Sequence, residues 1–307
     1  MAGQGGHDLA NVFDSAGDDR FVVKPNYVFA DTDDGRVWAT GFERINVFSR
    51  SGDDTVELSD SRGNDAFYQN RNDSILSGDG FANLARGFQN VFVESIGGTD
   101  FAQLSDTAAN DVFTVRGDQA RVESSTRLTT TDGFDRVNIV ATAGGYDRAV
   151  LIGSAGSDVL YADRNSTTMT ASSGEITRAV GFDRVDVNGG GGLDLSFVQG
   201  SEQNESFYAD SDEVEFQSTV QLLRMVQFEQ THFDGNGGAD EVTLEEFDEL
   251  DLLSGLGDQA TALLNGRSIT LEDFAYLEAG TSDGRDARQD IEAVDFLFTL
   301  KGDWHSF

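Results

Sequence analysis

The sequence contains no cysteine and a single proline, Pro25. Disulfide bonds, zinc–thiolate sites and a cysteine nucleophile are therefore excluded. Its 307 residues include only 21 lysines and arginines against 55 aspartates and glutamates, so the formal net charge is −34. Because nucleic acids and anionic lipids would be repelled by this charge, we expect neither as a partner. Cations, basic surfaces and neutral glycans fit it better.

Long apolar runs are also missing. No segment approaches the ~20 apolar residues that span a bilayer, so we expect no membrane insertion. Residues 1–12 lack the basic and apolar regions of a signal peptide. The hydrophobic content of 38% is nevertheless enough to bury a core. We expect a folded chain and, if it is exported, one that forms part of a larger protein.

An internal repeat of ~46 residues covers nearly the whole chain, and three markers define it. The first is a phenylalanine spaced by 46 or 48 residues, at Phe42, Phe88, Phe134, Phe182, Phe228 and Phe274. The second is an aspartate spaced by 46 or 47 residues after a glycine-rich or polar turn, at Asp8, Asp54, Asp100, Asp147, Asp194, Asp240 and Asp286. The third is an acidic residue 11 positions later, at Asp19, Asp65, Asp111, Asp158, Glu205 and Asp251. The markers predict repeat units near residues 4–50, 51–95, 96–141, 142–188, 189–234 and 235–282.

Each marker is followed by apolar and polar residues in alternation, which is typical of strands with one buried face. A half-repeat also emerges when the third marker is merged with the residue after each phenylalanine, because the steps then run between 22 and 25 residues. We therefore predict an all-β fold, a right-handed parallel β-helix (β-solenoid) of ~23-residue coils, two per repeat and 12 to 13 in all. The alternative is a six- or seven-bladed β-propeller, whose antiparallel blades have no reason to show the half-repeat.

The last residues depart from the repeat. Residues 287–307 lose the Gly/Asp turns and carry several large apolar side chains, among them Phe296, Phe298 and Trp304. We predict a solenoid over residues 1–286 and a C-terminal cap over 287–307, formed by a short helix or a terminal strand pair, because an uncovered end coil exposes apolar surface.

The recurring acids are the candidate metal ligands. Carboxylates ~5 Å apart in stacked coils would repel by about 1 kcal/mol per pair even in water, and Ca²⁺, which binds several oxygens, would offset this. The alternative is that each acid caps its own turn by accepting backbone N–H bonds. The candidate calcium ligands are Asp19, Glu43, Asp65, Asp111, Asp135, Asp158, Asp183, Glu205, Asp54, Asp100, Asp147, Asp194 and Asp240.

Residues 146–160 and 181–185 resemble the long Asp/Gly-rich repeats of large exported proteins of planctomycete-type marine bacteria. They are also distantly similar to hemolysin-type calcium-binding repeat proteins. The first resemblance implies a solenoid that is secreted or on the cell surface. The second implies calcium, but the Gly-Gly-x-Gly-x-Asp pattern occurs only as fragments, at 189–194 and 235–240, so its ligands are not transferred.

Little in the sequence favours catalysis. The histidines His7, His232 and His305 occupy unrelated repeat positions. We therefore predict a non-catalytic, extracellular structural or adhesive domain, with Ca²⁺ as its one suggested cofactor and with copies of itself, matrix components or glycans as partners. One alternative is a carbohydrate-active β-helix enzyme or glycan-binding module, which would need two non-repeating acids near residues 203–258. Another is a self-assembling surface filament.

Overall fold

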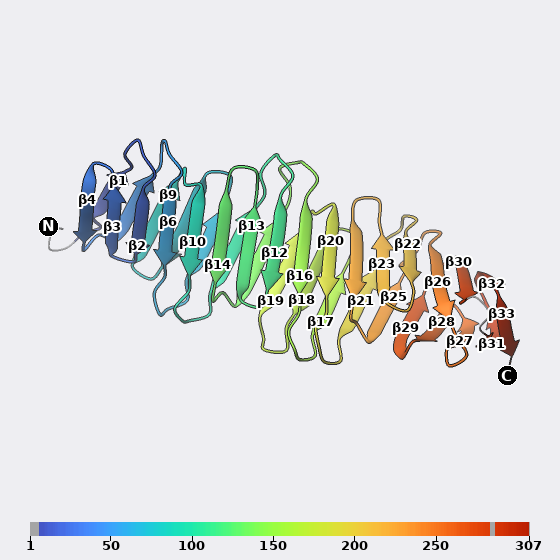
Figure 1. Ribbon diagram of the computed structural model, residues 1–307. Coiled ribbons are helices and arrows are strands. Elements are labelled where there is room, and N and C mark those ends of the chain that lie inside the picture. Colours follow the sequence, from blue (N-terminus) through green and yellow to red (C-terminus); the bar gives the residue numbers. More distant parts are fainter. Residues whose placement is uncertain (1–5, 283–285, 307) are drawn as a thin grey trace. The chain divides into compact units, whose positions relative to one another are not determined.

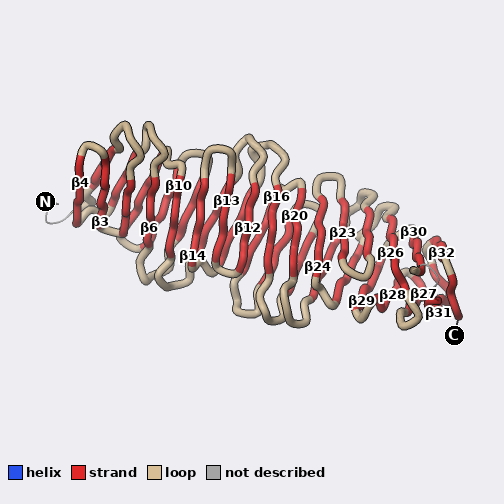
Figure 2. Tube along the Cα trace, in the orientation of Figure 1, coloured by secondary structure: helices blue, strands red, loops and turns tan. Residues whose placement is uncertain are grey.

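The computed structural model describes residues 6–282 and 286–306. Every regular element among these residues is a β-strand, and Figure 2 shows strands joined by loops with no helix in the described part. The fold is a β-solenoid, as the repeat predicted, and it has about 8 turns. The chain divides into two compact units, residues 1–149 with 175–177 (unit 1) and residues 150–174 with 178–307 (unit 2). Each unit contains two sheets, called A and B below.

The strands form where the sequence alternates. In β2 (Arg20–Lys24), Phe21 and Val23 are buried while Arg20 and Lys24 are exposed. This two-residue period places one face of the strand in the core and the other in solvent. Glycine-rich turns separate the strands, and at Gly98, with φ of 126°, a Cβ would lie 2.0 Å from a backbone oxygen of the neighbouring turn. Only glycine allows the two turns to approach this closely.

In unit 1 the strands lie side by side in two rows (Figure 1). Sheet A has the order β1 (Leu9–Phe13), β5 (Arg44–Phe48), β9 (Phe81–Arg86), β8 (Asp73–Gly78), β7 (Ala66–Gln69), β11 (Phe101–Ser105) and β15 (Arg136–Val140). Sheet B has the order β4 (Gly35–Thr40), β3 (Tyr27–Thr32), β2, β6 (Thr55–Ser59), β10 (Asn90–Glu94), β14 (Leu128–Asp132), β13 (Gln119–Glu123) and β12 (Val112–Arg116).

Unit 2 repeats this arrangement. Sheet A has the order β18 (Ser166–Thr170), β17 (Val159–Ala162), β21 (Leu195–Gln199), β25 (Gln230–Asp234), β29 (Arg267–Glu272), β28 (Gln259–Leu264), β27 (Leu252–Gly257), β31 (Asp286–Val294) and β33 (Asp303–Ser306). Sheet B has the order β20 (Arg184–Asn188), β24 (Leu222–Val226), β23 (Glu213–Gln217), β22 (Ser206–Ala209), β26 (Glu241–Phe247), β30 (Tyr276–Thr281) and β32 (Leu297–Lys301). The division between the units falls within β16 (Arg148–Ile152) and β19 (Ile176–Val180).

Each 46-residue repeat adds strands to the two sheets in three alternating steps. Two steps add a single strand, and the step between them adds a meander of three antiparallel strands. In unit 1 the chain places β1 in sheet A, the meander β2–β4 in sheet B, and β5 back in sheet A. The next repeat then starts in sheet B with β6 and places its meander β7–β9 in sheet A. Because the number of steps is odd, a repeat that begins in one sheet also ends in it, and the next repeat begins in the other sheet. Equivalent positions of successive repeats therefore lie in opposite sheets.

The predicted ~23-residue coil is therefore wrong, although the solenoid is right. Leu9 pairs with Arg44 and Asn90 pairs with Leu128, so parallel neighbours are 35 or 38 residues apart in these pairs. A turn of this size gives about 8 turns in place of the expected 12 to 13. The error arose because the three-strand meander lengthens each turn. The parallel pairing also excludes the propeller, whose blades are antiparallel.

The core consists of the inward residues of both sheets. In unit 2, Phe207 of sheet B stacks on Phe233 of sheet A with ring centroids 4.8 Å apart, and Phe216 approaches the same ring at 5.9 Å. In unit 1, Phe21, Phe67 and Phe113 are completely buried. Each such side chain contributes about 1.5–3 kcal/mol by leaving water. Of the marker phenylalanines, 88, 134, 182 and 228 are buried, whereas Phe42 is only half-buried.

Residues 287–306 continue the two sheets of unit 2 as strands, and no helix forms among them. Of the two forms expected for this segment, the structure has strands. β32 pairs with β30 and β33 pairs with β31, all in parallel. Leu297 remains 75% exposed and Phe298 44% exposed on the outermost strand of sheet B. A capping role for this segment stays a prediction.

Candidate functional site

The recurring acids form short columns that are linked through the backbone. Each acid immediately precedes a strand, and its own N–H donates to the side chain of the acid, or in one case the glutamine, one turn further along. The donor and acceptor residues are Asp8 to Glu43, Asp19 to Asp54, Asp54 to Gln89, Asp65 to Asp100, Asp100 to Asp135, Asp111 to Asp147, Asp158 to Asp194, Asp194 to Glu229 and Glu205 to Asp240, at 2.7–2.9 Å. The columns thus connect neighbouring turns.

Acids of the third marker also cap their own turns. A serine or threonine four positions earlier donates its N–H and its hydroxyl to the carboxylate, at 2.5–3.0 Å. The pairs are Ser15 with Asp19, Ser61 with Asp65, Thr107 with Asp111, Ser154 with Asp158 and Ser201 with Glu205. Charge-assisted bonds of this kind are about twice as strong as neutral ones. The acid and the hydroxyl residue therefore recur together because they fix one turn.

These columns differ in order from the expected stack. We expected Asp19, Glu43 and Asp65 to be successive members, but Asp19 is followed by Asp54, and Asp65 by Asp100. The second and third markers thus belong to one column, at an offset of 35 or 36 residues. Asp183, the remaining predicted ligand, is half-buried before β20, and its carbonyl accepts the Leu222 N–H at 2.9 Å.

Burial leaves several column carboxylates short of partners. One oxygen is buried without a hydrogen bond in each of Asp54, Asp111, Asp194 and Asp240. Burial raises the pKa of Asp194 and Asp240 to about 6, and repulsion from neighbouring carboxylates adds to this. At the exposed end of a column the direction reverses, since the Asp8 N–H bond lowers the pKa of Glu43.

One group of acids in unit 1 could hold a metal ion. Asp60, Asp65 and Asp100 are each at least 96% buried, and one carboxylate oxygen from each lies within 4.8 Å of the others. Burial, with repulsion from the other two carboxylates, raises the pKa of Asp60 to about 6. Among the described residues this is the one group of three or more potential ligands that meets so closely.

Asp60 was missed by the sequence analysis, although Asp65 and Asp100 were among the predicted ligands. A signal for it exists. Asp14, Asp60 and Asp106 recur at 46-residue intervals, five positions before the third marker, in the first three repeats only. At the same position the fourth and fifth repeats have Gly153 and Gly200.

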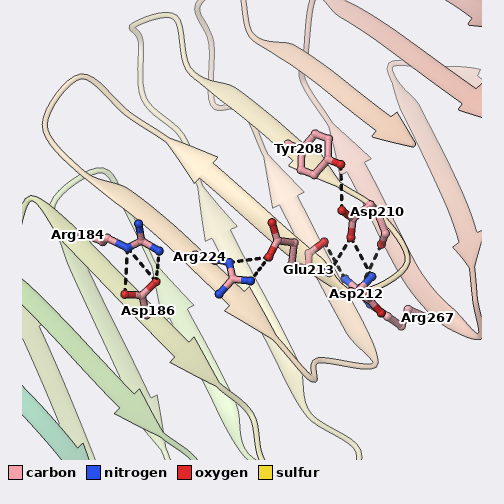
Figure 3. A network of polar contacts seen from close by, with 8 residues as sticks. All are labelled: Arg184, Asp186, Tyr208, Asp210, Asp212, Glu213, Arg224 and Arg267. Atoms are coloured by element: carbon pink, nitrogen blue, oxygen red, sulfur yellow. Dashed lines mark hydrogen bonds and ion pairs between the residues drawn. The ribbon is translucent and has the colours of Figure 1, made fainter. Parts of the chain in front are cut away.

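Outside the columns, the polar surface is organised by ion pairs. In unit 2, Arg184 pairs with Asp186 at 2.7 Å and Arg224 donates to Glu213 (Figure 3). Arg267 reaches the β22–β23 turn and donates to the carbonyls of Asp210 and Glu213 at 3.2 and 3.5 Å. These contacts tie neighbouring strands and turns together.

Acids line several surface hollows, among them Asp163 with Asp234 and Asp290 with Glu292. A hollow of about 430 Å³ in unit 2 is lined by Tyr161, Phe197 and His232 among others, and the two aromatic rings stack at 4.9 Å. A second, of about 330 Å³, contains Glu205 and Glu241 within the region 203–258. Glu205, however, is a column member bonded to Ser201. The hollow therefore lacks a pair of non-repeating acids.

Comparison with family models, curated proteins and solved structures found no match for this chain. None of the described segments forms a helix with the length and apolarity that a bilayer crossing requires.

Proposed function

We propose that this chain is a non-catalytic structural or adhesive domain, and that its β-solenoid acts as a spacer in a larger protein that is secreted or displayed on the cell surface. The observation that carries this proposal is the use of the acids. In successive repeats, the carboxylates accept hydrogen bonds from backbone N–H groups and so connect one turn to the next. Side chains occupied in this way serve the architecture.

The charge of the chain supports the same role. A net charge of −34 keeps a repeat protein soluble and repels other polyanions. Partners consistent with it are matrix components, neutral glycans and cations. Calcium is the cofactor we propose, because buried carboxylate oxygens without hydrogen-bond partners are hard ligands of the type that Ca²⁺ prefers. Calorimetry with calcium and with a chelator tests this part, since a ligand of the native state must raise the melting temperature.

Stretching single molecules between their ends tests the spacer role. Solenoid turns contact only their neighbours, so we expect them to unravel sequentially. A turn of 35 to 38 residues releases roughly 120 Å of extended chain. Steps of that length would support the proposal, and a single event that releases the whole chain would contradict it. A second experiment tests the non-catalytic part of the proposal by incubating the protein with neutral and acidic polysaccharides. New reducing ends would show catalysis and would contradict it.

Self-association is a second candidate function, favoured by the edge strand β4. Within the described residues, β4 pairs only with β3, and it exposes Val37 by 48% and Trp38 by 70%. Unpaired strand edges accept strands from other molecules. The proposed occupant is a second copy, whose own exposed edge β32 carries Leu297 and Phe298. Sedimentation should show concentration-dependent assembly that Trp38→Lys weakens, and a strict monomer at high concentration would contradict this function.

A further inference from the structure

The three buried carboxylates come from two connections, Asp60 and Asp65 from the one between β6 and β7 and Asp100 from the one between β10 and β11. Asp60 follows β6 in sheet B, Asp65 precedes β7 in sheet A, and Asp100 precedes β11 beside it. Their exposed fractions are 2%, 4% and 1%. The fold thus places three acids at one crossing between the sheets of unit 1, where solvent cannot screen them.

Hydrogen bonds satisfy only part of this cluster. Asp60 Oδ1 accepts a hydrogen bond from the Ile96 N–H at 2.7 Å, and Asp65 Oδ2 accepts hydrogen bonds from the N–H and the hydroxyl of Ser61. Asp60 Oδ2 and Asp65 Oδ1 are buried and have no partner. The Ser95 hydroxyl is close to Asp60, but its single proton goes to Asp100 Oδ2 at 2.6 Å. Two carboxylate oxygens therefore remain available.

No positive charge compensates the cluster. Among the described residues, no ion pair involves any of the three carboxylates. Like charges at this separation repel strongly in a buried setting, and a cation bound between them removes that repulsion. The cluster has the electrostatics of a cation site.

The distances fit one ion. Ca²⁺ binds carboxylate oxygens at 2.3–2.6 Å, so two ligands on opposite sides of the ion are at most about 5 Å apart. Oxygens that all lie within 4.8 Å of one another can touch the same ion. Zn²⁺ favours nitrogen and sulfur ligands, which are absent from this group, and Mg²⁺ retains most of its water. Calcium, completed by carbonyls and water, suits three carboxylates best.

Gly78, at the end of β8, packs against the cluster. A Cβ at this position would lie 1.5 Å from Asp65 Oδ1, the same oxygen that lacks a hydrogen bond. Because glycine has no Cβ, the Asp65 carboxylate can pack directly against the backbone of β8 here. An alanine here would have to displace the Asp65 carboxylate.

We propose that Asp60, Asp65 and Asp100 bind one Ca²⁺ ion and so lock the crossing between β6, β7 and β11. This inference rests on the calcium part of the proposed function and names its site. One ion is proposed, at one crossing of unit 1, and none along the columns. Asp14 and Asp106 occupy the same repeat position as Asp60, but among the described residues only Asp60, Asp65 and Asp100 bring three carboxylate oxygens within 4.8 Å of one another, and this distinguishes the crossing.

Calorimetric titration of the chelator-treated full chain with CaCl₂ tests the site, together with melting temperatures in Ca²⁺ and in chelator. The wild type should bind one ion and melt at a higher temperature in Ca²⁺. Asp60→Asn, which keeps the side-chain shape, should bind at least about 100-fold more weakly and show no calcium-dependent shift. In chelator it should melt no lower than wild type, because a repelling charge has been removed. Gly78→Ala should also lose affinity.

Asp106→Asn is the matched control. Asp106 occupies the position of Asp60 one repeat later, is also buried, and accepts the Ala143 N–H at 2.7 Å. We expect this variant to bind calcium like the wild type. No binding by the wild type, tighter binding of Mg²⁺ than of Ca²⁺, or unchanged binding by Asp60→Asn would each overturn the proposal. In the last case calcium would bind elsewhere and the calcium part of the proposed function would survive. The stretching experiment remains an independent test of the spacer role.

Discussion

Removal of a single column carboxylate should loosen one turn of the solenoid by a predictable amount. Asp158 accepts three hydrogen bonds through its side chain: the Ser154 N–H at 2.5 Å, the Ser154 hydroxyl at 2.7 Å and the Ser172 N–H at 2.7 Å. The substitution Asp158→Ala deletes all three at once. The backbone bond from the Asp158 N–H to Asp194 remains possible in this variant.

The magnitude follows from these contacts. A hydrogen bond to a charged group contributes about 1.5–3 kcal/mol, and the low end applies because Ser154 and Ser172 are partly exposed. Three bonds give roughly 4–5 kcal/mol. Removal of the charge also relieves repulsion on the Asp194 carboxylate, which returns about 1 kcal/mol. We expect a net loss of roughly 3 kcal/mol, and about half of that for Asp158→Asn, which keeps one acceptor oxygen.

Hydrogen exchange measures this loss locally, which matters because the chain contains two compact units. The amides of Ser154 and Ser172 should lose protection in Asp158→Ala, and urea unfolding should give the change in free energy. Asp258→Ala is the control, because Asp258 is exposed in the turn between β27 and β28. Equal effects of the two substitutions would refute the reasoning that column carboxylates hold the turns.

Three further predictions concern pH, core packing and turn geometry. Burial raises the pKa of Asp194 to about 6 from an ordinary 3.8, so its ionisation removes up to about 3 kcal/mol of stability as the pH rises from 4 to above 6. Urea unfolding should therefore show Asp194→Asn stabilising the chain more at pH 7.5 than at pH 4, and a pH-independent difference would contradict this. Phe207→Ala should cost about 3–5 kcal/mol in urea unfolding, because it empties a buried ring site. Tyr161→Ala, at a residue 56% exposed, should cost much less, and equal costs would argue against the described core. Gly98→Ala should lower the melting temperature more than Gly97→Ala, because both have positive φ but only the former meets a backbone oxygen, at 2.0 Å.

Local features of the fold were predictable from the sequence. The alternation around Phe21 and Val23 gave a strand with one buried face, and the structure has that strand with both side chains in the core. The alternative that each recurring acid caps its own turn is met at Asp19, whose carboxylate accepts the N–H and the hydroxyl of Ser15. Such features depend only on residues close together in the chain.

The size of the turn was not predictable in the same way. A strand alternates with period two whichever partner it has, so the pattern around Asp19 fits a neighbour 24 residues away as well as one 35 away. The structure chooses Asp54, because the meander β2–β4 occupies the intervening chain. The half-repeat in the sequence reflects the spacing of the loops between strands along the chain. It does not show which strands stack on one another.

The sequence by itself determined that this chain is a β-solenoid, which residues face the core and which acids recur. Composition and short-range alternation carry that information, because they decide burial residue by residue. Only the tertiary structure decided which strands pair, that successive repeats alternate between two sheets, and that Asp60 joins Asp65 and Asp100 in one buried group. The stacking of neighbouring turns depends on backbone hydrogen bonds between residues far apart in the chain, such as Leu9 and Arg44, and such bonds leave no mark on local sequence.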